Sequence, residues 1–157
     1  MDQPQGVCPE IELMVGRCLN AWTRVEGSLR NLFLVLNGQN ETALPCPLGA
    51  AFDSIQSFEV RLTMLNALIR ADPNTDRDNG AFRRAWHALY GNLSRNKRRR
   101  AEVAHFAIVT FITGNTGERR YELHPFFTLS SFRTGTKRGL TDKMLCAREA
   151  AFNNISV

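Results

Sequence analysis

The chain has 157 residues, of which 43% are apolar and 22% are charged. These are the proportions of an ordinary globular protein that is large enough to bury one core. No apolar run approaches the roughly 20 residues of a membrane-spanning helix, and the N-terminus lacks the charged start and apolar stretch of a secretory signal. A single domain over residues 1–157, located in the cytoplasm and not in a membrane, is therefore expected.

The four cysteines are scattered along the chain, at positions 8, 18, 46 and 146. None belongs to a C-x-x-C pair, and no His/Cys cluster has the spacing of a zinc site. Reduced thiols are the simplest interpretation, and neither a metal nor another cofactor is expected.

The first predicted element is a long helix that starts near residue 10. Its apolar residues recur at spacings of three and four: Ile11, Val15, Cys18, Trp22, Val25, Leu29, Leu32 and Leu36. Asn37-Gly38 is expected to end it, because both residues tolerate the left-handed backbone of a helix C-terminus. The stripe is longer than one ordinary partner helix would cover. It therefore favours a homodimer, although burial within the monomer is the commoner reason for such a stripe.

A loop and a second helix are expected next. The Pro and Gly content of residues 38–49 predicts the loop. A three–four rhythm then predicts one helix through Phe52, Ile55, Phe58, Leu62, Leu65 and Ile69. Asp72-Pro73 should end this helix, since the residue before proline is driven out of helical geometry, and the polar residues 74–80 should form a turn.

A third helix is predicted from Ala81. Its apolar seam passes through Phe82, Trp86, Leu89 and Leu93 and continues to position 96 or 97, then to Arg100, Val103 and Ala107. Arg100 thus occupies a position where the pattern requires an apolar residue. Such local misfits are expected at functional sites.

The last third of the chain changes character. β-branched and aromatic residues around a Gly-rich turn predict a β-hairpin over 106–127. Residues 128–139 read as a loop, and Thr141 is expected to cap a final helix over 141–156 that buries Leu145, Ala147, Ala150, Phe152 and Ile155. The predicted fold class is mainly α: an antiparallel helical bundle with a small β-hairpin after the third helix and a C-terminal helix.

Positive charge is concentrated in the third helix. Residues 83–105 contain seven Arg/Lys and one acid, whereas the rest of the chain contains 13 basic and 14 acidic residues. Five of these cations fall within six positions, at Arg95, Lys97, Arg98, Arg99 and Arg100. A basic patch favours partners that carry phosphate. A solubilising surface is the alternative, but a run of six residues cannot lie on one face of a helix.

The run leads into Arg100-Ala101-Glu102-Val103-Ala104-His105. This segment resembles the Arg-x4–6-His signature of the HEPN superfamily (higher eukaryotes and prokaryotes nucleotide-binding domain). The resemblance covers a helical core over residues 10–113, with the motif near the end of a late helix. The family commonly has Asn, Asp or His after the arginine, where this chain has Ala101.

The resemblance implies a metal-independent RNA endonuclease of the toxin or defence type, working as a homodimer. Its chemistry would be 2′-hydroxyl transesterification, with His105 as acid/base and Arg100 stabilising the phosphorane. Histidine titrates near pH 7, and arginine presents a permanent charge to phosphate oxygens. On a helix the two residues are about 140° apart, so we expect them to line opposite flanks of a cleft that a symmetric partner completes.

The other cations of the run, Arg95, Lys97, Arg98 and Arg99, are expected to grip the RNA backbone. Asn96 and Glu102 are candidate supporting residues, and a structural ion pair with an arginine is the expectation for Glu102. A core histidine is the competing interpretation of His105. His87 is expected at the surface or in packing, and His124 has no evident partner in the sequence.

A non-catalytic HEPN-like module is the alternative function, and Ala101 favours it. Such a module would bind nucleic acid, a nucleotide or a protein partner. In either case RNA is the expected ligand of the basic patch. An antitoxin or a separate nucleotidyltransferase is a possible protein partner, as the resemblance implies.

Overall fold

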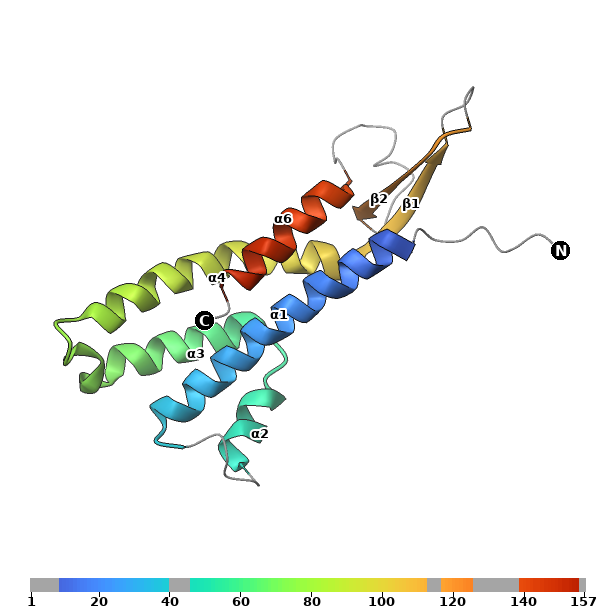
Figure 1. Ribbon diagram of the computed structural model, residues 1–157. Helices are drawn as coiled ribbons and strands as arrows, with labels where there is room; N and C mark the ends of the chain where they lie inside the picture. Colours follow the sequence, from blue (N-terminus) through green and yellow to red (C-terminus); the bar gives the residue numbers. More distant parts are fainter. Residues whose placement is uncertain (1–8, 40–45, 113–116, 126–138, 156–157) are drawn as a thin grey trace. The chain divides into compact units, whose positions relative to one another are not determined.

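The computed structural model describes residues 9–39, 46–112, 117–125 and 139–155. This part of the chain is mainly helical, with an antiparallel hairpin after the long helices and a C-terminal helix, which confirms the predicted fold class (Figure 1). The elements in chain order are α1 (Pro9–Leu36), α2 (Pro47–Ser54), α3 (Phe58–Ala71), the 3₁₀ helix η1 (Pro73–Asp76), α4 (Ala81–His105), β1 (Phe106–Ile112), β2 (Arg119–Pro125) and α6 (Asp142–Asn153).

The described residues form two compact units. Unit 1 contains residues 9–22 and 98–154, and unit 2 contains residues 23–97 together with residue 155, in each case as far as the structure describes them. The units are interleaved along the chain, because α1 and α4 each contribute residues to both. The expectation of a single domain stays a prediction.

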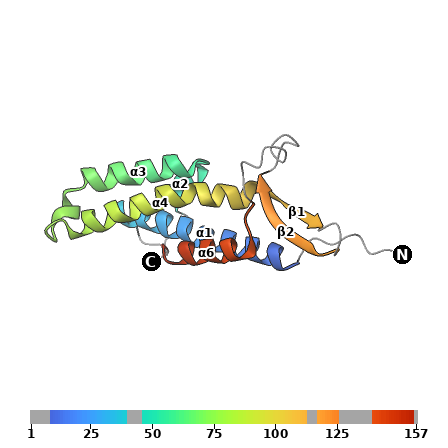
Figure 2. The same ribbon diagram turned by 90° about the horizontal axis from the view of Figure 1, so that it is seen from above.

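Unit 2 is built on an apolar core between the second half of α1, α2, α3 and the first part of α4. Its buried residues include Val25, Leu29, Phe33, Leu34, Phe52, Leu62, Leu65, Ile69, Trp86 and Leu93. The pairs Lys97–Glu59 and Trp86–Asn66 show that α3 and α4 run antiparallel, side by side in Figures 1 and 2. The stripe predicted for the second half of the first helix therefore faces this core.

The predicted second helix is wrong in its continuity. Residues 52–69 belong to two helices, α2 and α3, which are separated by three non-helical residues. Ile55 has an extended backbone (φ −75°, ψ 106°), and the side chain of Ser57 accepts a hydrogen bond from the backbone N–H of Val60. The break arises because Ser57 offers a good N-cap, and the apolar rhythm continues across it.

The predicted loop over 38–49 is also too long. Pro47, Leu48 and Gly49 form the first turn of α2, where Pro47 occupies a position that needs no N–H donor. Sγ of Cys46 accepts a hydrogen bond from the backbone N–H of Gly49 at 3.3 Å and caps the helix. Residues 40–45 lie outside the described part of the chain.

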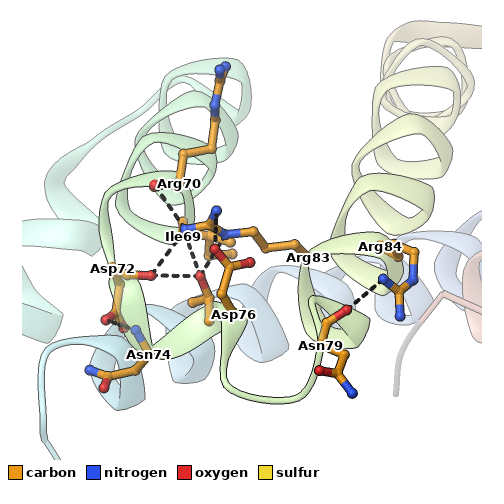
Figure 3. Close-up of polar contacts among 9 residues, drawn as sticks. Ile69, Arg70, Asp72, Asn74, Asp76, Asn79, Arg83 and Arg84 are labelled. Atoms are coloured by element: carbon orange, nitrogen blue, oxygen red, sulfur yellow. Dashed lines mark hydrogen bonds and ion pairs between the residues drawn. The ribbon is translucent and has the colours of Figure 1, made fainter.

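The predicted end of the first helix and the turn before α4 are confirmed. Gly38 has φ +69°, the left-handed conformation expected after α1. Asp72 is the C-cap of α3, and its side chain accepts a hydrogen bond from the backbone N–H of Asn74. Within the turn, the guanidinium of Arg83 points into the loop and meets several of its oxygen atoms (Figure 3).

Unit 1 contains the first half of α1, the end of α4, the hairpin and α6. Along α1 and α6, Cys18 contacts Leu145 and Trp22 contacts Phe152, so the two helices run parallel to one another (Figures 1 and 2). Burial raises the pKa of the Cys18 thiol to about 11, which keeps it protonated. The thiol therefore donates its hydrogen to the backbone oxygen of Leu145, at 3.3 Å.

The last helix is shorter than predicted. It spans Asp142–Asn153, with Thr141 as the predicted N-cap, its side chain accepting from the N–H of Met144. Leu145, Phe152 and Ile155 are buried as expected, but Ala147 and Ala150 are exposed. The predicted face was wrong at the alanines, because alanine is compatible with either side of a helix.

The hairpin is confirmed for its strands. Its register pairs Phe106 with Pro125 and Ile112 with Arg119, while residues 113–116 and 126–138 lie outside the described chain. Leu123 exchanges two backbone hydrogen bonds with Leu140, at 2.9 and 2.7 Å. This bridge ties β2 to the segment that leads into α6.

Within the described residues, no helix is both long enough and apolar enough to cross a membrane.

Candidate nucleic-acid interface

The end of α4 presents one exposed face in unit 1. Arg98, Glu102 and His105 are spaced by four and three residues, so they lie within about 60° of one another around the helix axis. The side chain of Arg98 is 86% exposed, and His105 is exposed as the last residue of the helix. The exposure of His105 excludes its interpretation as a core histidine.

Arg100 lies on the other side of the helix. It is followed one turn later by Val103, which is 2% exposed, so the apolar seam does pass through Arg100 as predicted. Nε of Arg100 is buried and, within the described part of the chain, has no hydrogen-bond partner. The residue as a whole stays half-buried. Burying a guanidinium nitrogen without an acceptor is unfavourable, so apolar packing alone does not account for an arginine at this position.

The expectation that Arg100 and His105 do not share a face is confirmed. One side chain follows the buried seam, and the other is exposed at the end of the helix. Within one chain, the cation on the same face as His105 is Arg98. The spacing of the motif determines this divergence, because five residues correspond to about one and two-fifths turns.

Glu102 is held by two arginines. Its Oε2 lies 2.5 Å from Nη2 of Arg148 on α6, and its Oε1 lies 3.4 Å from Nε of Arg98. Nη1 of Arg148 also donates to the backbone oxygen of Arg99, at 2.8 Å. The expected structural ion pair of Glu102 is confirmed, but Arg148, the partner at 2.5 Å, comes from a distant helix and was not anticipated from the sequence.

The remaining candidate residues have local contacts in unit 2 or at its border. Lys97 forms an ion pair with Glu59 of α3, so it joins two helices. Arg95 is exposed and donates to the side-chain oxygen of Asn92. Asn96 is buried, and its Nδ2 donates to the backbone oxygen of Asn92 at 3.0 Å. Asn96 thus supports the helix and does not lie on the exposed face.

The hairpin contains a buried polar group that the sequence did not reveal. Nε2 of His124 lies 2.9 Å from Oε2 of Glu122, and Nη2 of Arg120 lies 3.0 Å from Oε1 of the same carboxylate. The ring of Phe111 packs against His124, with 5.3 Å between centroids. The view that His124 has no partner is wrong. Alternation along β2 puts residues 120, 122 and 124 on one face, and this spacing was the available signal.

Gly139 packs directly against this group, which gives a test. A Cβ atom at position 139 would lie 2.6 Å from Oε2 of Glu122 and would also overlap Nε2 of His124. We expect Gly139→Ala to lower the free energy of unfolding by about 1–3 kcal/mol, as overpacking does. Thermal and urea unfolding would measure it.

Gly16→Ala is the matched control, because nothing lies within 4 Å of a Cβ there. Gly16 lies inside α1, so its replacement should stabilise the helix by about 0.5–1 kcal/mol. Equal stability of the Gly139→Ala variant and the parent chain would contradict the packing that we describe.

The other histidine and the tryptophans conform to expectation. His87 is exposed on α4, whereas Trp22 and Trp86 are buried in units 1 and 2. Among the described residues, no group of three or more His, Cys, Asp or Glu side chains is arranged to hold a metal ion.

No protein-family model, no curated protein and no solved structure matches the chain. The end of α4 combines an exposed imidazole, a cationic run, and an arginine with a buried nitrogen that has no hydrogen-bond partner among the described residues.

Proposed function

We propose that this protein is a metal-independent RNA endonuclease that acts as a homodimer in the cytoplasm, in a toxin or defence role. Arg98 and the neighbouring cations of the run bind the RNA backbone. His105 transfers the proton, and Arg100 stabilises charge on the phosphorus centre. The proposal combines the resemblance of the Arg100–His105 segment to the HEPN signature with the burial and charge of the same residues.

The observation that carries the proposal is Arg100. Its Nε is buried without an acceptor among the described residues, and the nearest acid on the helix, Glu102, already pairs with Arg148 and Arg98. A phosphate oxygen would bind the part of this half-buried guanidinium that stays exposed, in the geometry that arginine prefers. A plain solvated surface would not need an arginine in the apolar seam.

The chemistry follows from the groups present. The ribose 2′-oxygen attacks the adjacent phosphorus while a basic group accepts its proton, and the bond from phosphorus to the 5′-oxygen breaks. The 5′-oxygen takes up a proton, and the other fragment ends in a 2′,3′-cyclic phosphate. Imidazole suits these proton transfers near neutral pH, and a fixed guanidinium suits the charge that develops on the phosphorane.

The proposed mechanism requires a second copy of the chain. Arg100 and His105 face different sides of one helix, so a single chain presents them to different surfaces. Two-fold symmetry repeats both residues on the second chain, so that Arg100 of one chain and His105 of the other line opposite flanks of one cleft. The dimer is therefore part of the proposed mechanism.

The experiment that tests the proposal is incubation of the purified full chain with labelled single-stranded RNA in the presence of EDTA. We expect cleavage with 2′,3′-cyclic phosphate ends, and no cleavage of the same sequence as 2′-O-methyl RNA, which lacks the nucleophile. RNA that stays intact at micromolar protein would reject the nuclease.

A second candidate is a non-catalytic module that binds RNA through the same face. It is favoured by Ala101, which follows Arg100 without the polar side chain common in the family, and by the divergence of Arg100 from His105 within one chain. This candidate keeps the basic surface and dispenses with the proton transfer. RNA binding without any cleavage would distinguish it from the nuclease.

Both candidates predict that charge reversal at Arg98 and Arg99 weakens RNA binding. Each lost phosphate contact should reduce the slope of log affinity against log salt by about one. Fluorescence anisotropy with 2′-O-methyl RNA at several salt concentrations measures this. The matched control is reversal of Arg70 and Arg77, two exposed arginines of unit 2. An unchanged slope for the Arg98/Arg99 variant would remove this patch from the interface.

A further inference from the structure

Arg148 connects α6 to the end of α4 that carries Arg98 and Glu102. It lies on α6, 46 residues after Glu102, and its side chain is only 12% exposed. Its guanidinium forms two contacts with α4: Nη2 lies 2.5 Å from Oε2 of Glu102, and Nη1 donates to the backbone oxygen of Arg99 at 2.8 Å. Two contacts from one guanidinium hold both the carboxylate of Glu102 and the backbone of α4 in place.

Glu102 is the acid whose negative charge most opposes RNA binding at the proposed interface. It lies on the same exposed face as Arg98 and His105, and its Oε1 is already 3.4 Å from Arg98. A carboxylate at this position repels phosphate and competes with it for Arg98. Arg148 counters this effect, because it neutralises the carboxylate from the α6 side and draws one of its oxygens there.

We propose that Arg148 is a positioning residue for RNA binding: it holds Glu102 in an ion pair on the α6 side, so that the carboxylate competes less with RNA phosphate for Arg98. The inference rests on the proposed function and goes beyond it by naming a residue outside the motif. Arg148 is too buried to be a main contact of the ligand, so its effect passes through Glu102. Lysine would keep the charge but lose the two-pronged contact.

The test is a double-mutant cycle on the full chain. Affinity for 2′-O-methyl RNA is measured for the wild type, Arg148→Met, Glu102→Gln and the double variant. We expect Arg148→Met to weaken binding by about threefold to tenfold, consistent with the loss of roughly one phosphate contact. In the Glu102→Gln background the same change should have no effect, because the carboxylate that Arg148 controls is gone.

Two further variants separate positioning from other roles. Lys143→Met removes one positive charge from an exposed position of the same helix and should change affinity by less than about twofold, as an exposed distant charge does. Arg148→Lys should fall between the wild type and Arg148→Met. Thermal unfolding of every variant confirms that the chains compared are folded. If Arg148→Met does not fold, the Arg148→Lys cycle replaces it.

The outcomes distinguish the possible failures. An equal loss from Arg148→Met with and without Glu102 means that Arg148 contacts RNA directly, and it overturns the inference. A loss from Lys143→Met as large as that from Arg148→Met means that only net charge matters, and it has the same consequence. If the wild type binds no RNA, the proposed function fails and the inference fails with it. Binding with an additive cycle rejects the inference alone.

Discussion

Replacement of His105 by alanine is expected to lower the rate of RNA cleavage by about 10²–10⁴-fold, the usual contribution of a positioned acid or base. His105 is exposed at the end of α4, on the same face as Arg98, where a phosphodiester held by the basic patch would lie. Because the imidazole is assigned to proton transfer, the rate constant at saturating RNA should fall while the affinity for 2′-O-methyl RNA stays within about twofold.

The measurement is single-turnover cleavage of labelled RNA in EDTA, together with binding of the 2′-O-methyl analogue. His87→Ala is the matched control, because His87 is also an exposed histidine of α4 but lies far along the helix from the motif. A His105→Ala variant that cleaves RNA at the wild-type rate would end the catalytic assignment. A control variant that loses activity equally would show that the effect is not specific to His105.

Replacement of Arg83 by methionine is expected to lower the free energy of unfolding by about 2–3 kcal/mol, because it leaves buried or half-buried oxygen atoms without a charged donor. The guanidinium meets the turn between α3 and α4 at several points (Figure 3). Nε donates to the buried hydroxyl of Thr75 at 2.9 Å, and Nη1 lies 2.7 Å from the carboxylate of Asp76. Nη2 donates to the backbone oxygens of Arg70 and Asp72, at 3.2 and 3.3 Å.

The buried hydroxyl of Thr75 connects this network to the end of α3. It lies 2.9 Å from the backbone oxygen of Ile69 and 2.7 Å from that of Asp72, so its single hydrogen serves the end of α3 while its lone pair accepts from Arg83. Loss of Arg83 therefore weakens the C-terminus of one helix and the start of the next together.

Urea unfolding followed by circular dichroism measures this loss. Arg84→Met is the matched control, since Arg84 is exposed and its Nη1 donates to a single atom, the backbone oxygen of Asn79, at 2.7 Å. We expect it to cost less than about 1 kcal/mol, the usual net worth of one exposed contact. Arg83→Lys should show most of the loss in unfolding free energy that is expected for Arg83→Met, because an ammonium does not span the same oxygens. Equal effects of the Arg83→Met and Arg84→Met variants would show that the network contributes little.

Features that depend on local periodicity were predictable from the order of the amino acids. The stripe from Ile11 to Leu36 predicted α1, and the left-handed Gly38 ends it as expected. The same reasoning located Arg100 in an apolar seam and separated it from His105 by a rotation of the helix, since both follow from 3.6 residues per turn. The helix end at Asp72-Pro73 and the cap at Thr141 were also evident, because proline restricts the residue before it and a capping side chain acts within three residues of its own position.

Contacts between polar side chains that are distant in the sequence or lie within a strand became evident from the three-dimensional fold. The pairing of Glu102 with Arg148 spans 46 residues, and the approach of Gly139 to His124 depends on how two backbones meet. The break between α2 and α3 was likewise invisible, because Ile55 and Phe58 keep the rhythm of a continuous helix. Periodicity reports which residues of one element share a face, but polar partners on different elements are selected by three-dimensional proximity, which spacing along the chain does not report.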